Sequence, residues 1–183
     1  MAAILLAMFI PTFAFQFFLP LLCHAENHQS KPDVVDAFKA LAAFPYAVAM
    51  ADNDDSGDLN CMTAVRTKFS KKPPVFVYAS FMKGRKGDNR TITYHIKPGP
   101  TIDTTEFTVD DDYDHTSQAH YLFSDYKNCI IMELPIYGKQ ECVLWTRAKK
   151  ADNVPAICKE QLQEKCKNAV ISYDENTCGP LSL

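Results

Sequence analysis

Six cysteines follow the apolar N-terminal segment of the chain, and they restrict its fold more than any other feature. Their number is even, and no C-x-x-C pair occurs among them. Because structural zinc sites are usually built from closely spaced cysteines, this pattern indicates three disulfides and no metal site. The cysteines are Cys61, Cys129, Cys142, Cys158, Cys166 and Cys178.

The first 25 residues indicate secretion. They contain no Asp, Glu, Lys or Arg, and they end in Cys23-His24-Ala25, with small residues at the positions read by signal peptidase. An apolar stretch of this length also suits a membrane anchor. Because Pro11 and Pro20 interrupt it, we predict a cleaved signal peptide over residues 1–25. One secreted, extracellular and monomeric domain is expected over residues 26–183.

Charge and motifs exclude several classes of function. The 183-residue chain has a net charge of -3 at pH 7, so it lacks the positive potential that attracts nucleic acid or an anionic membrane. It contains no G-x-S-x-G, H-E-x-x-H or G-x-G-x-x-G motif and no phosphate-binding loop. We therefore expect a protein that binds without chemistry and without a cofactor.

Periodicity separates a short N-terminal helix, a run of strands and a longer C-terminal helix. Residues 32–41 place apolar side chains three apart, and residues 154–168 return to helical spacing, with Asp152 or Asn153 as the expected cap. The segments between them predict an all-β fold, an antiparallel β-barrel with flanking helices, with a sandwich as the alternative. Strands are expected at 61–69, 75–82, 91–97, 105–109, 119–123, 129–134, 141–146 and 170–173.

Helix geometry narrows the disulfide pairing. Cys158 and Cys166 are expected on one helix, where a separation of eight residues places them about 12 Å apart. A disulfide needs Cα atoms within about 7 Å, so these two cysteines do not bond to each other. The strand cysteines Cys129 and Cys142 are their natural partners, which leaves Cys61 for Cys178. Helix geometry does not decide which strand cysteine forms a disulfide with which helix cysteine.

Three polar segments are expected at the surface. The segment 52–57 has the oxygen side chains of a calcium loop, but Thr63 occupies the position of the bidentate glutamate, so we predict a hairpin loop. The acidic segment 110–114, next to His115 and His120, is interpreted as a turn without a metal. Asn89-Arg90-Thr91 is a site for N-glycosylation in a secreted chain, which predicts an exposed position for Asn89.

Aromatic side chains are frequent in the expected strands. They fit a packed core equally well as the wall of a ligand pocket, because a barrel of about eight strands can hold one small ligand. They are Phe76, Tyr78, Phe81, Tyr94, Phe107, Tyr121, Phe123 and Trp145.

The cysteine framework and its flanking residues resemble the tick salivary lipocalins of the histamine-binding protein family. The similar segments are 36–41 and 59–61 near the start, and 128–131, 142–145 and 153–158 towards the end, followed by Cys178. The resemblance implies a lipocalin-type barrel with disulfides Cys61–Cys178 and Cys129–Cys158. Cys142–Cys166 is then the third bridge.

The resemblance also implies a function. Such proteins sequester a host mediator, histamine or another biogenic amine, to blunt host defence; the alternatives are a lipid mediator or sterol, or a protein partner such as a complement component bound through loops. Amine binders of the family carry acidic residues where this chain has Ile130 and Val143. By strand alternation Glu141 shares a face with Val143, so it lies either inside as a substitute counter-ion or at the solvated rim. The expected ligand-binding residues are Tyr78, Tyr121, Ile130, Glu141, Val143 and Trp145.

Overall fold

The computed structural model describes residues 34–54, 56–83 and 89–181. The predicted signal peptide, residues 1–25, lies outside these ranges. Within them, no helix has the length and apolar character needed to cross a membrane.

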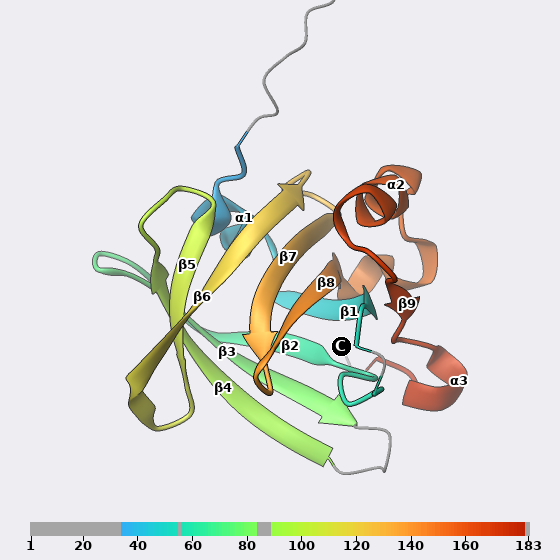
Figure 1. Cartoon of the computed structure of the whole chain (residues 1–183), viewed down its shortest axis with the longest axis horizontal. Helices are drawn as coiled ribbons and strands as arrows, with labels where there is room; N and C mark the ends of the chain where they lie inside the picture. The colour runs from blue at the N-terminus through green and yellow to red at the C-terminus, as the bar shows by residue number, and fades with distance from the viewer. Residues whose placement is uncertain (1–33, 55, 84–88, 182–183) are drawn as a thin grey trace, which may run out of the picture. The chain divides into compact units, whose positions relative to one another are not determined.

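Eight antiparallel strands close into a barrel, which confirms the predicted fold class (Figure 1). Neighbours in sequence pair in order from β2 to β8, and β1 lies between β8 and β2 and closes the cylinder. A short ninth strand, β9, pairs antiparallel with the last residues of β1. The strands are β1 (Tyr46–Asp52), β2 (Thr63–Lys71), β3 (Pro74–Lys83), β4 (Asn89–Pro98), β5 (Thr104–Val109), β6 (Asp112–Ser124), β7 (Cys129–Ile136), β8 (Lys139–Arg147) and β9 (Val170–Ile171).

Two strands differ from the sequence-based expectation. The closing strand β1 was not predicted as a separate strand, because its alternating alanines have low β-propensity and give a weak hydrophobic signal. Strand β6 begins at Asp112 rather than at residue 119. The acidic segment 110–114 was expected as a turn between strands, and the turn is shorter than that segment: Asp110 has φ 51°, and Asp112 already pairs with Val109.

Helix α1 (Ala37–Ala43) starts later than predicted. Asp36 has extended backbone angles, and its side chain accepts a hydrogen bond from the Lys39 amide at 2.8 Å, so it is the N-cap rather than a helical residue.

The C-terminal helix α2 (Ala156–Lys165) begins after Pro155, and it has no side-chain cap. The predicted cap residues, Asp152 and Asn153, lie instead in a preceding 3-10 helix, η1 (Ala148–Asn153). The prediction of a side-chain cap was therefore wrong. A last short helix, α3 (Glu175–Cys178), ends the described fold.

Three disulfides attach the C-terminal segment to the barrel. Cys129–Cys158 and Cys142–Cys166 fasten α2 and its end to the outer face of β7 and β8, with Cα–Cα distances of 6.2 and 5.7 Å. Cys61–Cys178 joins the start of β2 to α3, with a Cα–Cα distance of 5.2 Å. These pairs match the ones implied by the resemblance, and they hold a helix whose own apolar face is weak.

Candidate functional site

A cavity lies inside the barrel, with about 60 Å³ of free space for the centres of water molecules. This is enough space for several waters, since one water needs about 10–15 Å³ by the same measure. The cavity wall is mostly aliphatic and aromatic, and among the described residues that line it none is acidic, basic or histidine. Its polar groups are the hydroxyls of Tyr78, Ser80, Tyr94, Thr105 and Tyr121 and the indole of Trp145.

Strand alternation produces this wall. Along β7, Ile130, Met132 and Leu134 line the cavity, whereas Cys129 and Ile131 face outward and pack towards α2. Ile130 pairs across the ladder with Trp145 on β8, so these two side chains lie next to each other on the inner face.

Small side chains create the space. Ala47 on β1, Ala64 on β2 and Ala119 on β6 are buried and line the cavity. Sequence reasoning concentrated on aromatic residues and missed these alanines. The signal that identifies them is an alanine at an inward position of a strand, where a larger side chain would fill the barrel.

Helix α1 closes one end of the barrel. Leu41 on α1 and Phe44 just after it line the cavity, and the Tyr78 hydroxyl lies 2.9 and 2.8 Å from their two backbone carbonyl oxygens. Arg66 donates to the Ala42 carbonyl at 2.9 Å. The amide of Ala37 also donates to a backbone carbonyl, that of residue 102 in the β4–β5 connection, at 2.9 Å. These four hydrogen bonds fasten the closed end.

At the opposite end of the barrel, the β7–β8 turn contacts β3 and β4. Tyr137 and Gly138 both have positive φ, at 50° and 79°, as a two-residue hairpin turn with right-handed strand twist requires. The Tyr137 hydroxyl lies 3.8 Å from the Met82 sulfur, and the Arg90 guanidinium lies 5.4 Å from the centre of the Tyr137 ring. These contacts join strands on opposite sides of the barrel rim.

Four of the six predicted ligand-binding residues, Tyr78, Tyr121, Ile130 and Trp145, line the cavity. The other two, Val143 and Glu141, do not line it. Val143 faces inward but is fully buried among its neighbours, and it does not line the cavity.

Glu141 lies neither in the large cavity nor at a solvated rim. Only 5% of its surface is exposed, and it lines a separate space of about 30 Å³ with Asp54, Leu59 and Tyr137. The β1–β2 loop covers the start of β8 beside Glu141. The loop is held in this conformation by backbone amides that donate to the Asp54 carboxylate. Sequence alternation gave the correct face of Glu141 but not the loop that covers it.

Trp145, one of the residues that line the cavity, carries a polar atom without a hydrogen-bond partner among the described residues. The indole Nε1 of Trp145 is buried and makes no hydrogen bond. An unpaired buried N–H costs about 1–3 kcal/mol, so a group that accepts its hydrogen bond gains that amount on binding. The Tyr78 hydroxyl, in contrast, is already occupied by the α1 carbonyls.

Burial raises the pKa of all three tyrosines in the wall, and it raises the pKa of two of them, Tyr78 and Tyr94, to about 12 each. Because the folded-state pKa lies above the ordinary value of 10, the neutral rings contribute stability below pH 10. This contribution is lost as the pH rises from about 10 to about 12.

We therefore expect the free energy of unfolding to fall with pH above 10, by about 1.4 kcal/mol per pH unit for each of the two rings. Tyr94→Phe should remove one ring's share of this slope, as measured by chemical denaturation at about pH 9 and about pH 11. If the free energy of unfolding of the variant falls with pH as steeply as that of the unchanged protein, the raised pKa of Tyr94 is contradicted.

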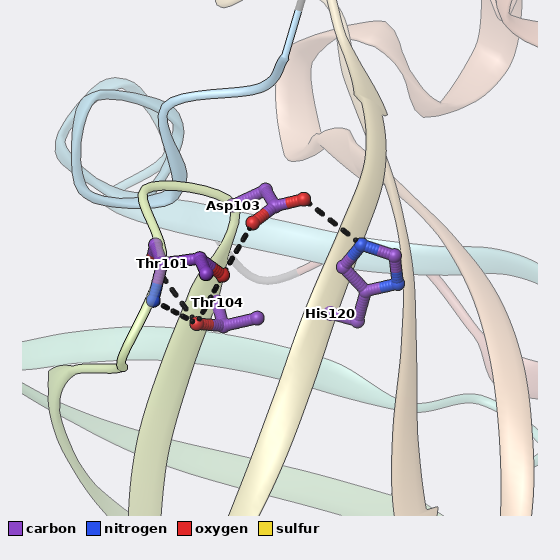
Figure 2. A network of polar contacts seen from close by, with 4 residues as sticks. All are labelled: Thr101, Asp103, Thr104 and His120. Carbon is purple, nitrogen blue, oxygen red and sulfur yellow. Dashed lines mark hydrogen bonds and ion pairs between the residues drawn. The ribbon is translucent and has the colours of Figure 1, made fainter.

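The acidic and histidine residues of the 103–120 region form two separate pairs. His115 Nδ1 lies 2.8 Å from Asp112 Oδ1 at the exposed start of β6. Figure 2 shows the second pair: His120 Nε2 lies 3.1 Å from Asp103 Oδ2, and Asp103 also accepts from Thr101. The Thr101 hydrogen bond, helped by His120, lowers the pKa of Asp103. This network fixes the β4–β5 connection against β6, next to α1.

Comparisons with known proteins agree with this architecture. A family model described as tick histamine binding protein matches residues 25–179. No curated protein sequence matches the chain.

Several solved structures share the fold. The serotonin complex of AM182 has a TM-score of 0.61 and 17% identity, covering 81% of this chain and 95% of that one. Japanin from Rhipicephalus appendiculatus, bound to cholesterol, has a TM-score of 0.54 and 11% identity, covering 72% and 94%. Lobster apocrustacyanin A1 has a TM-score of 0.57 and 13% identity, covering 76% and 81%. Because the family model covers most of the sequence and the barrel has a lipocalin-like form, the chain belongs to the tick histamine-binding protein family.

Proposed function

We propose that the mature chain is secreted and sequesters a small host mediator inside its barrel. Three disulfides support an oxidising, extracellular destination. The cavity inside the barrel supports a small ligand rather than a protein partner as the main target. The family and the fold are those of ligand-binding proteins rather than enzymes.

The composition of the cavity wall favours an apolar mediator that carries a hydrogen-bond acceptor, such as a lipid mediator or a sterol. Two observations support this proposal. The described residues of the wall include no charged side chain, and the buried indole N–H of Trp145, one of these residues, has no hydrogen-bond partner. A carbonyl or hydroxyl oxygen accepts from this N–H, whereas an ammonium group has only donors. The flexible side chains of Met62 and Met132 in the wall allow the cavity to adapt to a longer apolar ligand.

Histamine or another biogenic amine is the second candidate, and it is supported by the family. Burying an ammonium group costs several kcal/mol unless a carboxylate replaces the lost water. Cation–π contacts with the tyrosine rings return only about 0.5–2 kcal/mol each. Glu141 lies on the inward face, but Val143 separates it from Trp145 along β8. An amine therefore needs a rearrangement of the β1–β2 loop that an apolar ligand does not need.

Trp145 is the only tryptophan of the chain, so its fluorescence reports directly on the cavity. We expect 1-dodecanol to change the emission in a saturable manner. Dodecylamine, which has the same tail but an ammonium head at neutral pH, should bind at least about tenfold more weakly, a difference of about 1.4 kcal/mol. Tryptophan amide in buffer is the control for non-specific quenching. Tighter binding of the amine would contradict the apolar assignment.

A further inference from the structure

A groove with about 550 Å³ of open space lies on the outer surface, between strands β2–β4 and the C-terminal segment. Phe81 on β3 forms part of its floor, with Val65 on β2 beside it. The Phe81 ring is 45% exposed, although it sits in the middle of a paired region. The other wall comes from Tyr173 and Pro180.

The three residues of the glycosylation sequence, 89–91, line this groove. In the β3–β4 ladder Lys83 is opposite Asn89, and Phe81 is opposite Thr91. Opposite residues share a face, and the intervening Met82 is buried inside the barrel, so Phe81 and Asn89 both lie on the outer face. They are diagonal neighbours, a position in which Cβ atoms are about 7–8 Å apart and a long substituent reaches the ring.

We propose that Asn89 carries an N-linked glycan whose first sugar packs on the ring of Phe81 and occupies this groove. The proposal rests on the proposed secretion, because the glycan is attached only in the secretory pathway. It is independent of the identity of the ligand in the barrel, since Phe81 and Asn89 lie outside the wall of the cavity.

The chemistry of the groove fits an N-acetylglucosamine unit. One face of the sugar ring presents C–H groups, and placing this face on Phe81 removes apolar surface of both partners from water. The hydroxyl and amide groups of the sugar remain towards the polar sides of the groove, where Thr63 and Thr91 flank Phe81. Lys83 donates to the Thr177 carbonyl at 3.2 Å and ties the sheet to α3, so the floor and the wall are held together.

The experiment uses a matched pair of variants in a secreting eukaryotic host. Thr91→Ser keeps the glycosylation sequence, and Thr91→Val removes it while conserving the shape of the side chain. Each is combined with Phe81→Ala, and glycans are trimmed enzymatically to the first sugar. The same four proteins, refolded from bacteria without glycan, show whether the substitutions themselves change stability.

We expect intact-mass measurement to show one glycan on the Thr91→Ser protein and none on the Thr91→Val protein. The single sugar should raise the melting temperature by about 2–4 °C, and Phe81→Ala should abolish this increment. The difference in melting temperature between the bacterial Ser and Val variants gives the effect of the side chain itself, since Val favours a strand more than Ser does, and it is subtracted from the difference between the secreted proteins. An unmodified Asn89 in the secreted protein overturns the proposal, and so does an increment that persists without Phe81. Dodecanol binding, measured in the same samples, should be unaffected, so failure here is distinguishable from failure of the proposed function.

Discussion

Replacing Cys61 and Cys178 together with serine is expected to lower the free energy of unfolding by about 4–5 kcal/mol. This bridge closes a segment of 117 residues. The chain entropy that a cross-link removes from the unfolded state grows with the logarithm of the loop length, and a loop of about 100 residues corresponds to about 4.7 kcal/mol. Chemical denaturation of the refolded protein measures the loss.

The other two bridges are matched controls. They close 29 and 24 residues, and the same relation gives about 3.5 kcal/mol for each. The double-serine variants of Cys129–Cys158 and Cys142–Cys166 should therefore be destabilised about equally, and less than the first variant. If removal of Cys61–Cys178 has the smallest effect of the three, the long cross-link does not act mainly on the unfolded state.

The second large effect is expected from filling the cavity. Ala119→Leu extends a side chain from β6 into the space that the alanines leave free. We expect the affinity for the apolar ligand to fall roughly 100-fold, about 2.7 kcal/mol. Because free space is present at this position, the folded protein should lose less than about 1.5 kcal/mol of stability. Titration of Trp145 fluorescence and chemical denaturation give the two quantities separately.

Ala79→Leu is the corresponding control on the outer face. Ala79 lies on β3 opposite Val65 and Thr93, away from the cavity, so this substitution should leave ligand binding unchanged. A protein antagonist that acts through its loops would behave differently. Its activity would survive Ala119→Leu and would instead be lost on changing the β1–β2 loop, for example through Asp58→Ala.

The sequence was sufficient to predict the barrel and most of its strands, because residues 61–69 and 91–97 alternate in polarity and residues 75–82 are rich in Val, Phe and Tyr. It failed for β1, whose alanines carry little hydrophobic signal, although one of them, Ala47, lines the cavity. The pairing of the cysteines was narrowed by helix geometry, and the choice between the remaining pairs came from the resemblance.

The candidate site was only partly predictable. Sequence reasoning, from the aromatic content and the resemblance, named Tyr78, Tyr121, Ile130 and Trp145 as ligand-binding residues, and all four line the cavity. It did not find the cover over Glu141, because this cover depends on a loop whose fold is set by local hydrogen bonds to Asp54 rather than by periodicity. The sequence also could not predict that the indole N–H of Trp145 is unpaired, because hydrogen-bond partners depend on how the interior packs.

The most direct test of the proposed ligand class is a calorimetric titration of histamine into the disulfide-intact mature protein at physiological salt, with 1-dodecanol titrated in parallel. The uncharged wall around Trp145 predicts saturable heat for the alcohol and no saturable binding of histamine at micromolar concentration. Saturable histamine binding at or below about 1 μM, which corresponds to about -8 kcal/mol, would contradict the account. It would show that a carboxylate contacts the bound ammonium group. Glu141 would be the first residue to test by substitution.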